Sequence, residues 1–115
     1  MKNIIYTELR RRGFNVDVGI VEKRNNLDNG KKDYKQLEID LMVNKGSDKY
    51  YIQSAYGIED NNKKEQKLQS LLNVGDNFKK IVIVYDHFIK WQDDNGIIYM
   101  SIYDFLLNEN SLKEA

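Results

Sequence analysis

The side chains whose types and spacing could do chemistry are two acids and one short run. Glu8 falls in an expected first helix, Asp40 falls in the middle of an expected strand, and Gln53-Ser54-Ala55 ends the strand that follows. An acid on a strand beside its hairpin partner, close to further oxygen-bearing side chains, is what a Mg²⁺ site would use. The first expectation is therefore that the fold brings these three features together.

The elements that would position these residues follow from hydrophobic periodicity and turn residues. The expected helices are residues 1–12, 59–74 and 101–107, and the expected strands are residues 14–21, 34–43, 50–55, 79–85 and 97–100. This order, α-β-β-β-α-β-β-α, predicts an α/β domain with a central mixed β-sheet flanked by helices. The second helix would serve as a right-handed crossover between parallel strands.

The direction of Asp40 depends on the expected strand 34–43. Ile39, Leu41 and Val43 alternate along it and would share one buried face. Asp40 would then point away from that face. The polar segment 108–115 is expected to fray.

Composition limits the class of protein. The 115 residues suffice for one hydrophobic core, and 18 basic residues cancel 18 acidic ones, so no global basic field would recruit nucleic acid. The absence of Cys excludes a disulfide framework, and a single His excludes a two-His mechanism. With no apolar run of about 20 residues and no secretory signal, we expect a cytoplasmic protein that does not contact a membrane.

Three segments carry a resemblance to a known family: NIIYTELRRRGFNVDVG, QLEIDLMV and YYIQSAYGI. Together they resemble the C-terminal domain of unknown function of prokaryotic P-loop AAA-type ATPases. That domain is similar to the PD-(D/E)xK restriction-endonuclease-like fold. The resemblance covers nearly all of residues 1–115 and implies a single restriction-endonuclease-like domain excised from the C-terminus of a larger ATPase.

The resemblance assigns roles to four positions. Glu8 matches the helical acid of the nuclease fold, and Asp40 matches the motif Asp that would bind a divalent ion. Gln53 stands where the second acid belongs and Ala55 where the Lys belongs. Asp40 and Gln53 are thus the implied metal ligands, although an amide binds Mg²⁺ more weakly than a carboxylate. Ala55 offers no charge to stabilise a developing phosphorane.

A lysine from the second helix could replace the missing one. Lys63, Lys64 and Lys67 lie in that helix, and Gln66 and Gln69 could contact nucleic acid from it. The alternative is an ordinary solvated helix face. Of the three lysines, Lys67 is the one placed in the alternative site.

Glu8 and Asp40 also have an ordinary interpretation: Glu8 could pair with Arg11 or Arg12 one helical turn away, and Asp40 could lie exposed on an uncovered face of the sheet.

Other residues have a binding interpretation and an ordinary one. The basic run 10–12 with Lys2 could contact phosphate or complement a helix end. His87 could act as a general base or be structural. Three tyrosines could form a contact patch or pack in the interior: Tyr50, Tyr51 and Tyr56. The strand at 97–100 could be an unpaired edge that mediates dimerisation.

Two functions follow from these expectations. The first is a non-catalytic accessory or interaction domain of a larger ATP-binding protein, with a degenerate nuclease-like site and no cofactor. Its partners would be the N-terminal ATPase module, a further protein or nucleic acid. The alternative is a Mg²⁺-dependent nuclease acting on DNA, with a non-standard site built on Glu8, Asp40, Gln53 and Lys67.

Overall fold

The computed structural model describes residues 2–26, 32–56, 61–74 and 76–115, and the side chains of residues 3–19, 38–55, 67–74 and 76–115. The elements are α1 (Lys2–Arg11), β1 (Asn15–Asn26), β2 (Lys32–Lys45), β3 (Asp48–Tyr56), α2 (Asn61–Leu72), β4 (Lys79–Tyr85), β5 (Trp91–Gln92), β6 (Ile98–Ser101) and α3 (Ile102–Leu107). The predicted α/β class is confirmed.

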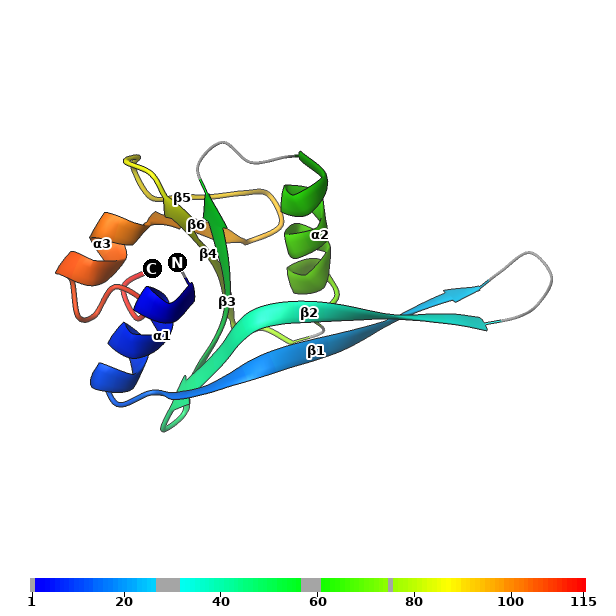
Figure 1. Cartoon of the computed structure of the whole chain (residues 1–115), viewed down its shortest axis with the longest axis horizontal. Coiled ribbons are helices and arrows are strands. Elements are labelled where there is room, and N and C mark those ends of the chain that lie inside the picture. Colours follow the sequence, from blue (N-terminus) through cyan, green and yellow to red (C-terminus); the bar gives the residue numbers. More distant parts are fainter. Residues whose placement is uncertain (1, 27–31, 57–60, 75) are drawn as a thin grey trace.

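The strands form one mixed sheet in the order β1-β2-β3-β4-β6-β5. Strands β1, β2 and β3 are antiparallel neighbours, whereas β3, β4 and β6 run parallel. Helix α2 connects β3 to the parallel β4, as a crossover must. Figure 1 shows α1 and α3 on one side of the sheet and α2 on the other.

Two expectations about the last strands are wrong. The predicted order lacks β5, because a strand of two residues carries no periodic signal. The segment predicted as an unpaired edge, residues 97–100, lies largely in β6, which pairs with β4 on one side and with β5 on the other. Among the described strands the edges of the sheet are β1 and β5.

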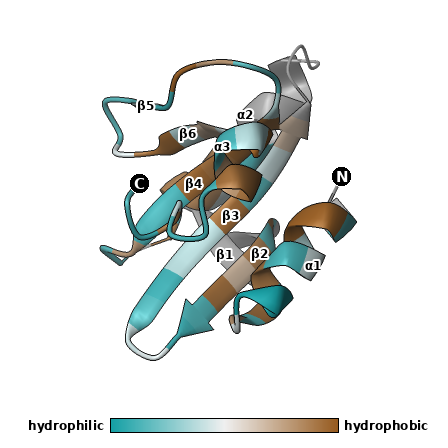
Figure 2. Ribbon diagram, turned by 90° about the vertical axis from the view of Figure 1, so that its left-hand side faces the viewer, coloured by the Kyte–Doolittle hydropathy of each residue, from teal (hydrophilic) through white to brown (hydrophobic). Residues whose placement is uncertain are grey.

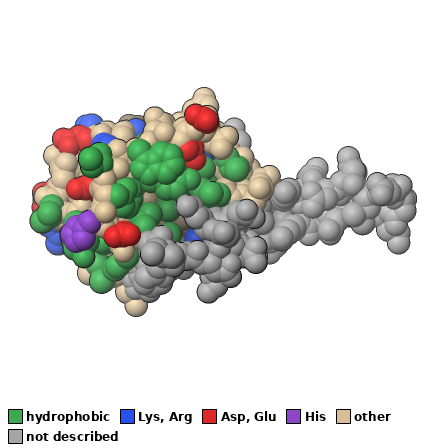
Figure 3. All heavy atoms as spheres, turned by 90° about the horizontal axis from the view of Figure 1, so that it is seen from above, with side chains coloured by type: hydrophobic (Ala, Val, Ile, Leu, Met, Phe, Trp, Pro, Cys, Tyr) green, Lys and Arg blue, Asp and Glu red, His purple; other side chains and the backbone are tan. Residues whose placement is uncertain are grey.

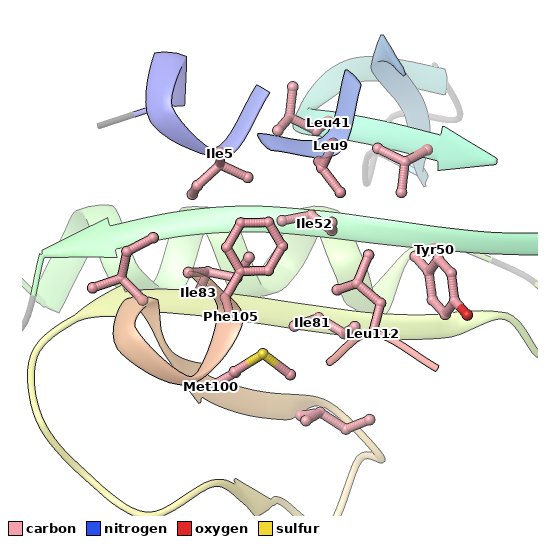
Figure 4. Packing of buried hydrophobic residues seen from close by; sticks show 13 residues of the cluster. Ile5, Leu9, Leu41, Tyr50, Ile52, Ile81, Ile83, Met100, Phe105 and Leu112 are labelled. Carbon is pink, nitrogen blue, oxygen red and sulfur yellow. The ribbon is translucent and has the colours of Figure 1, made fainter. Parts of the chain in front are cut away.

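The larger core cluster lies between the sheet and the helices α1 and α3 (Figure 4). Ile5 and Leu9 of α1 and Phe105 of α3 are fully buried against it. The end of the chain joins this cluster, because Ser111 and Leu112 are buried as well. The prediction that residues 108–115 fray is therefore wrong. The segment is mostly polar, but the burial of Ser111 and Leu112 holds it against the body of the protein.

A Schellman motif ends α1. Gly13 has a positive φ of 89°, its N–H donates to the carbonyl of Arg10, and the N–H of Phe14 donates to the carbonyl of Leu9, both at 3.0 Å. The side chain of Phe14 packs against the same cluster as Leu9. A glycine in the left-handed conformation is the usual residue at this position of the motif.

A smaller cluster lies on the opposite face of the sheet, under α2. Leu71 of α2 packs there with Ile39, Tyr51, Ala55 and further residues of β4 and β6. In Figure 2 the apolar residues colour the middle of the sheet, while the ends of β2 and β3 near their turn are hydrophilic. The sheet is thus covered on both faces.

Strand β2 does not alternate as predicted. From Asp17 to Gly19 strand β1 advances two residues, while β2 advances three, from Met42 to Ile39. This β-bulge inserts one residue into β2 and reverses the faces beyond it. Ile39 consequently packs in the α2-side cluster, whereas Leu41 and Val43 pack in the α1-side cluster. The expectation that these three share a face is wrong.

Gly19 lies at this bulge because two strands approach closely there. A Cβ at Gly19 would lie 2.6 Å from Cγ of Met42 and 3.2 Å from Cβ of Ile39. Beyond the bulge, β2 pairs only with β1, out to Asn26 opposite Lys32, and Figure 1 shows these two strands as a ribbon that leaves the body of the molecule.

Candidate polar site where strands β2 and β3 separate

The candidate site lies where β2 leaves β3. The ladder between these strands runs from Lys45 opposite Asp48 to Leu41 opposite Ile52. Asp40 is the residue next to Leu41 on β2, just outside the ladder, and Gln53 is the residue next to Ile52 on β3, also just outside it. Two of the residues predicted for a site, Asp40 and Gln53, are thus brought together where β2 and β3 separate. We call this place the fork.

Gln53 holds the fork together. Its side chain is fully buried, and its Oε1 accepts the backbone N–H of Asp40 at 2.8 Å. Its Nε2 donates to the carbonyls of Glu38 and of Lys67, each at 3.2 Å. One amide therefore replaces the missing ladder bond and ties β3 to β2 and to α2. A buried amide satisfied by three backbone groups is a structural element of the fork.

The carboxylate of Asp40 is held by β3. Its Oδ2 accepts from the backbone N–H and from the hydroxyl of Ser54, both at 3.0 Å. Lys67 approaches from α2: its Nζ lies 4.0 Å from Oδ2 of Asp40 and donates to the carbonyl of Ser54. We call these three residues the Asp40 cluster. Ser54 is buried, whereas the side chains of Asp40 and Lys67 are 19% and 31% exposed.

The donors of this cluster do not fit a divalent cation. Mg²⁺ needs near-octahedral oxygen ligation and binds through one or more carboxylates. Here the oxygen of Gln53 faces a backbone N–H, and the ammonium group of Lys67 already contacts the Ser54 carbonyl and approaches the carboxylate. In the described part of the chain no three His, Cys, Asp or Glu side chains come together.

Glu8 lies in a different network. Its carboxylate accepts from Arg11 at 2.7 and 2.9 Å and from Arg12 at 3.0 Å. The hydrogen bond from Arg11 is the main reason that the pKa of Glu8 falls to about 2. Helical spacing of three and four residues creates these pairs. The structure thus supplies the ordinary partners of Glu8, and none of them belongs to the Asp40 cluster.

The side chains of the basic run 10–12 largely make hydrogen bonds and ion pairs within the protein. The side chain of Arg12 is only 4% exposed, and it donates to Ser111 Oγ at 3.1 Å and to the carbonyl of Phe105 at 2.5 Å. Arg11 reaches Glu109 at 2.9 Å. These bonds fasten α1 to α3 and to the end of the chain. The side chain of Lys2 lies outside the described residues.

The remaining candidates are scattered. Tyr50 and Tyr51 are buried, so they do not form an exposed patch. His87 is exposed (Figure 3, purple) and stacks on Tyr103 at 4.0 Å between ring centroids. Ala55 packs in the α2-side cluster. The side chains of four further candidates lie outside the described residues: Tyr56, Lys63, Lys64 and Gln66.

Reasoning from sequence did not give Ser54 a role. It supplies two donors to Asp40 and a carbonyl to Lys67, so it is the residue around which the Asp40 cluster is built. Its only signal in the sequence is its place between Gln53 and Ala55. A hydroxyl in that place is compatible with many structures, so the sequence alone does not indicate that Ser54 contacts Asp40.

Comparison with known proteins shows a similarity to part of a longer protein. No family model matches the chain. The chain is 32% identical over 107 residues to an uncharacterized protein of Haemophilus influenzae. The match takes in 93% of this chain but only 22% of the length of that protein. The chain is therefore similar to one part of a considerably longer protein.

Among the described residues no helix is long and apolar enough to cross a membrane.

Proposed function

We propose that this chain is a non-catalytic accessory domain of a larger ATP-binding protein, with a degenerate nuclease-like site. The observation that carries the proposal is the position of Lys67. Its ammonium group contacts the Ser54 carbonyl and lies 4.0 Å from Oδ2 of Asp40. These are the hard oxygen donors that a cation would take. A side chain of the protein itself thus supplies the positive charge at the fork.

The order of the elements supports a restriction-endonuclease-like core. A helix is followed by the antiparallel strands β1, β2 and β3, and α2 then leads to β4, which is parallel to β3. Asp40 and Gln53 lie where β2 and β3 part, at equivalent places on the two strands. This agrees with the resemblance to the nuclease fold that QLEIDLMV and YYIQSAYGI suggest.

The similarity to 22% of a longer protein supports a domain that acts beside other domains. The partner that we propose is an ATPase module in the same polypeptide, with a further protein or nucleic acid as the second contact. The test is to express the ATPase module with and without this chain and to compare ATP hydrolysis by the two proteins. An accessory domain changes the rate or the assembly of the module without cleaving nucleic acid itself.

One observation favours a second candidate, a Mg²⁺-dependent nuclease acting on DNA. Lys67 reaches Asp40 from α2, which is the position required of a lysine that replaces the one missing at Ala55. In that candidate Lys67 would stabilise the charge that develops on the scissile phosphate.

The decisive experiment compares the wild type with Lys67→Ala, Lys67→Arg and Asp40→Asn. Titration calorimetry with Mg²⁺ and Mn²⁺ measures cation binding, and incubation with single- and double-stranded DNA measures cleavage. We expect no cleavage by any of these proteins and no cation binding by the wild type. Lys67→Ala should gain weak cation binding, because it uncovers the Asp40 carboxylate and the Ser54 carbonyl. Lys67→Arg is the matched control, since it retains the charge.

Adding Asp40→Asn to Lys67→Ala should abolish the gained binding. Circular dichroism of each variant verifies that it is folded. Cleavage by the wild type that Lys67→Ala and Asp40→Asn both abolish would establish the nuclease and refute the accessory domain. Cation binding by the wild type that requires Asp40 would also contradict the proposal.

A further inference from the structure

Tyr50 is a buried side chain with an unsatisfied end. It is 5% exposed, and its ring packs edge-on against Phe14 with 6.1 Å between centroids and an angle of 68°. Figure 4 shows its hydroxyl oxygen directed away from the core cluster. Among the described residues this hydroxyl has no hydrogen-bond partner. A buried phenol normally finds one, so the free hydroxyl needs an explanation.

Two hollows lie beside Tyr50 at this end of the sheet. The larger, of about 590 Å³, lies between the end of α1, the β2–β3 turn and residues 109–113. The smaller, of about 280 Å³, lies on the other side of the turn, beside Lys79. Tyr50 lines both of them. The larger hollow is within the range of sites for small molecules, and its lining contains several cations.

The two arginines of the larger hollow are already neutralised. Arg11 pairs with Glu8 and with Glu109, and Arg12 pairs with Glu8. Arg11 donates to these carboxylates from Nε and Nη2, and Arg12 donates in addition to Ser111 and to the carbonyl of Phe105. The two arginines therefore form part of the wall of the hollow, and the unpaired positive charge of the hollow comes from its lysines.

Two lysines at the hollow lack a carboxylate partner among the described residues. Lys45 donates to the carbonyl of Arg12 at 2.9 Å and lies 5.8 Å from the ring centroid of Phe14. Lys113 borders the same hollow, and its ammonium group has no partner in the described part of the chain. Of the two carboxylates that line the hollow, Glu109 pairs with Arg11, which leaves Asp48 as the opposing charge. Two ammonium groups against one carboxylate leave the hollow positive.

We propose that this hollow binds the phosphate group of a small phosphate monoester, with Lys45, Lys113 and the Tyr50 hydroxyl as donors to its oxygens. A monoester carries nearly two negative charges at pH 7, which suits two lysines better than a singly charged carboxylate does. Phe14 provides an apolar wall for the organic part of the ligand. The site belongs to the opposite end of β3 from the Asp40 cluster, so it is independent of the function proposed above.

The test uses the whole chain and two probes, inorganic phosphate and adenosine monophosphate. Binding is followed by the shifts of backbone amide signals in nuclear magnetic resonance. Tyr50→Phe removes the hydroxyl and keeps the ring, so we expect about fivefold weaker binding, the contribution of one hydrogen bond. Lys113→Gln should weaken binding at least as much. Tyr6→Phe is the control, because Tyr6 is an exposed tyrosine elsewhere on α1.

A second measurement does not depend on the ligand. In the absence of phosphate, Tyr50→Phe should unfold at the same temperature as the wild type or above it, because the hydroxyl makes no bond within the protein. A clear loss of stability would show that the hydroxyl has an internal partner and would overturn the proposal. It is equally overturned if neither probe binds at millimolar concentration, or if binding is unchanged in Tyr50→Phe and Lys113→Gln. A short single-stranded oligonucleotide is a third probe; if it binds through these residues and the monophosphate does not, the ligand is a phosphodiester and the choice of a small molecule is wrong.

Discussion

Replacing Arg12 by methionine should destabilise the protein far more than the same change at Arg11. The side chain of Arg12 is 4% exposed and that of Arg11 is 56% exposed. Both pair with Glu8, so the two variants remove the same kind of ion pair from the same carboxylate. They differ in what else is lost, which makes Arg11→Met a matched control.

The magnitude follows from the contacts of Arg12. Its guanidinium group donates to Glu8, Ser111 and the carbonyl of Phe105, and it lies 4.6 Å from the ring centroid of Phe105. Hydrogen bonds to charged groups contribute about 1.5–3 kcal/mol each, but the guanidinium regains hydration in the unfolded chain. Glu8 also keeps Arg11. The net loss should therefore lie at the low end of the range for a broken buried pair, about 3 kcal/mol.

Urea unfolding followed by circular dichroism measures this loss. We expect Arg12→Met to lower the free energy of unfolding by about 3 kcal/mol, equivalent to about 12 °C in Tm for a domain of this size. Arg11→Met should lose less than about 1 kcal/mol, as exposed ion pairs do. Equal losses in the two variants, within about 0.5 kcal/mol, would refute the idea that Arg12 fastens α1 to α3.

Two further predictions concern carboxylates. Because the pKa of Glu8 is lowered from its ordinary value of 4.5 to about 2, its stabilising effect should be complete above about pH 5 and disappear as the pH falls toward 2. The difference in unfolding free energy between wild type and Glu8→Gln, measured across this range, should shrink accordingly, and a constant difference would contradict the assignment. Asp93 accepts from the backbone N–H groups of Asn95 and Ile97 and from the hydroxyl of Tyr99, so Asp93→Ala should cost about 2 kcal/mol in urea unfolding, whereas the exposed neighbour Asp94→Ala should change stability by less than about 0.5 kcal/mol.

Much of the fold could be predicted because it depends on local signals. The cap at Gly13 needs only a glycine after a helical repeat, and the run KKIVIVY indicates a buried strand by its length and composition. The bulge in β2 could not be predicted, because it depends on the register between β1 and β2, in which Met42 lies opposite Asp17 and Ile39 opposite Gly19. It is also the reason that Ile39 and Leu41 pack on different faces.

The candidate site could be predicted in part for the same reason. Asp40 and Gln53 were identified from their places on two strands of a hairpin, and the helical register of α2 allowed Lys67 to reach them. The bonds of Gln53 could not be predicted, since they depend on where β2 and β3 separate. For Glu8 the sequence allows two interpretations, and the structure confirms the ordinary one, ion pairs with Arg11 and Arg12 one helical turn away.

The amide at position 53 also limits how this sequence can change. A Gln codon becomes a Glu codon by a single nucleotide substitution, so the acid of a nuclease site is genetically close. A carboxylate there would have no N–H for the carbonyls of Glu38 and Lys67, which now accept from Nε2, and its oxygens would face theirs. Repulsion between these oxygens would separate β3 from β2 and α2, so the new carboxylate would disrupt the place at which a metal ion would bind. Gain of an acid at this position would therefore require compensating changes in β2 or α2 first, so the mutational route to it is longer than the genetic code suggests.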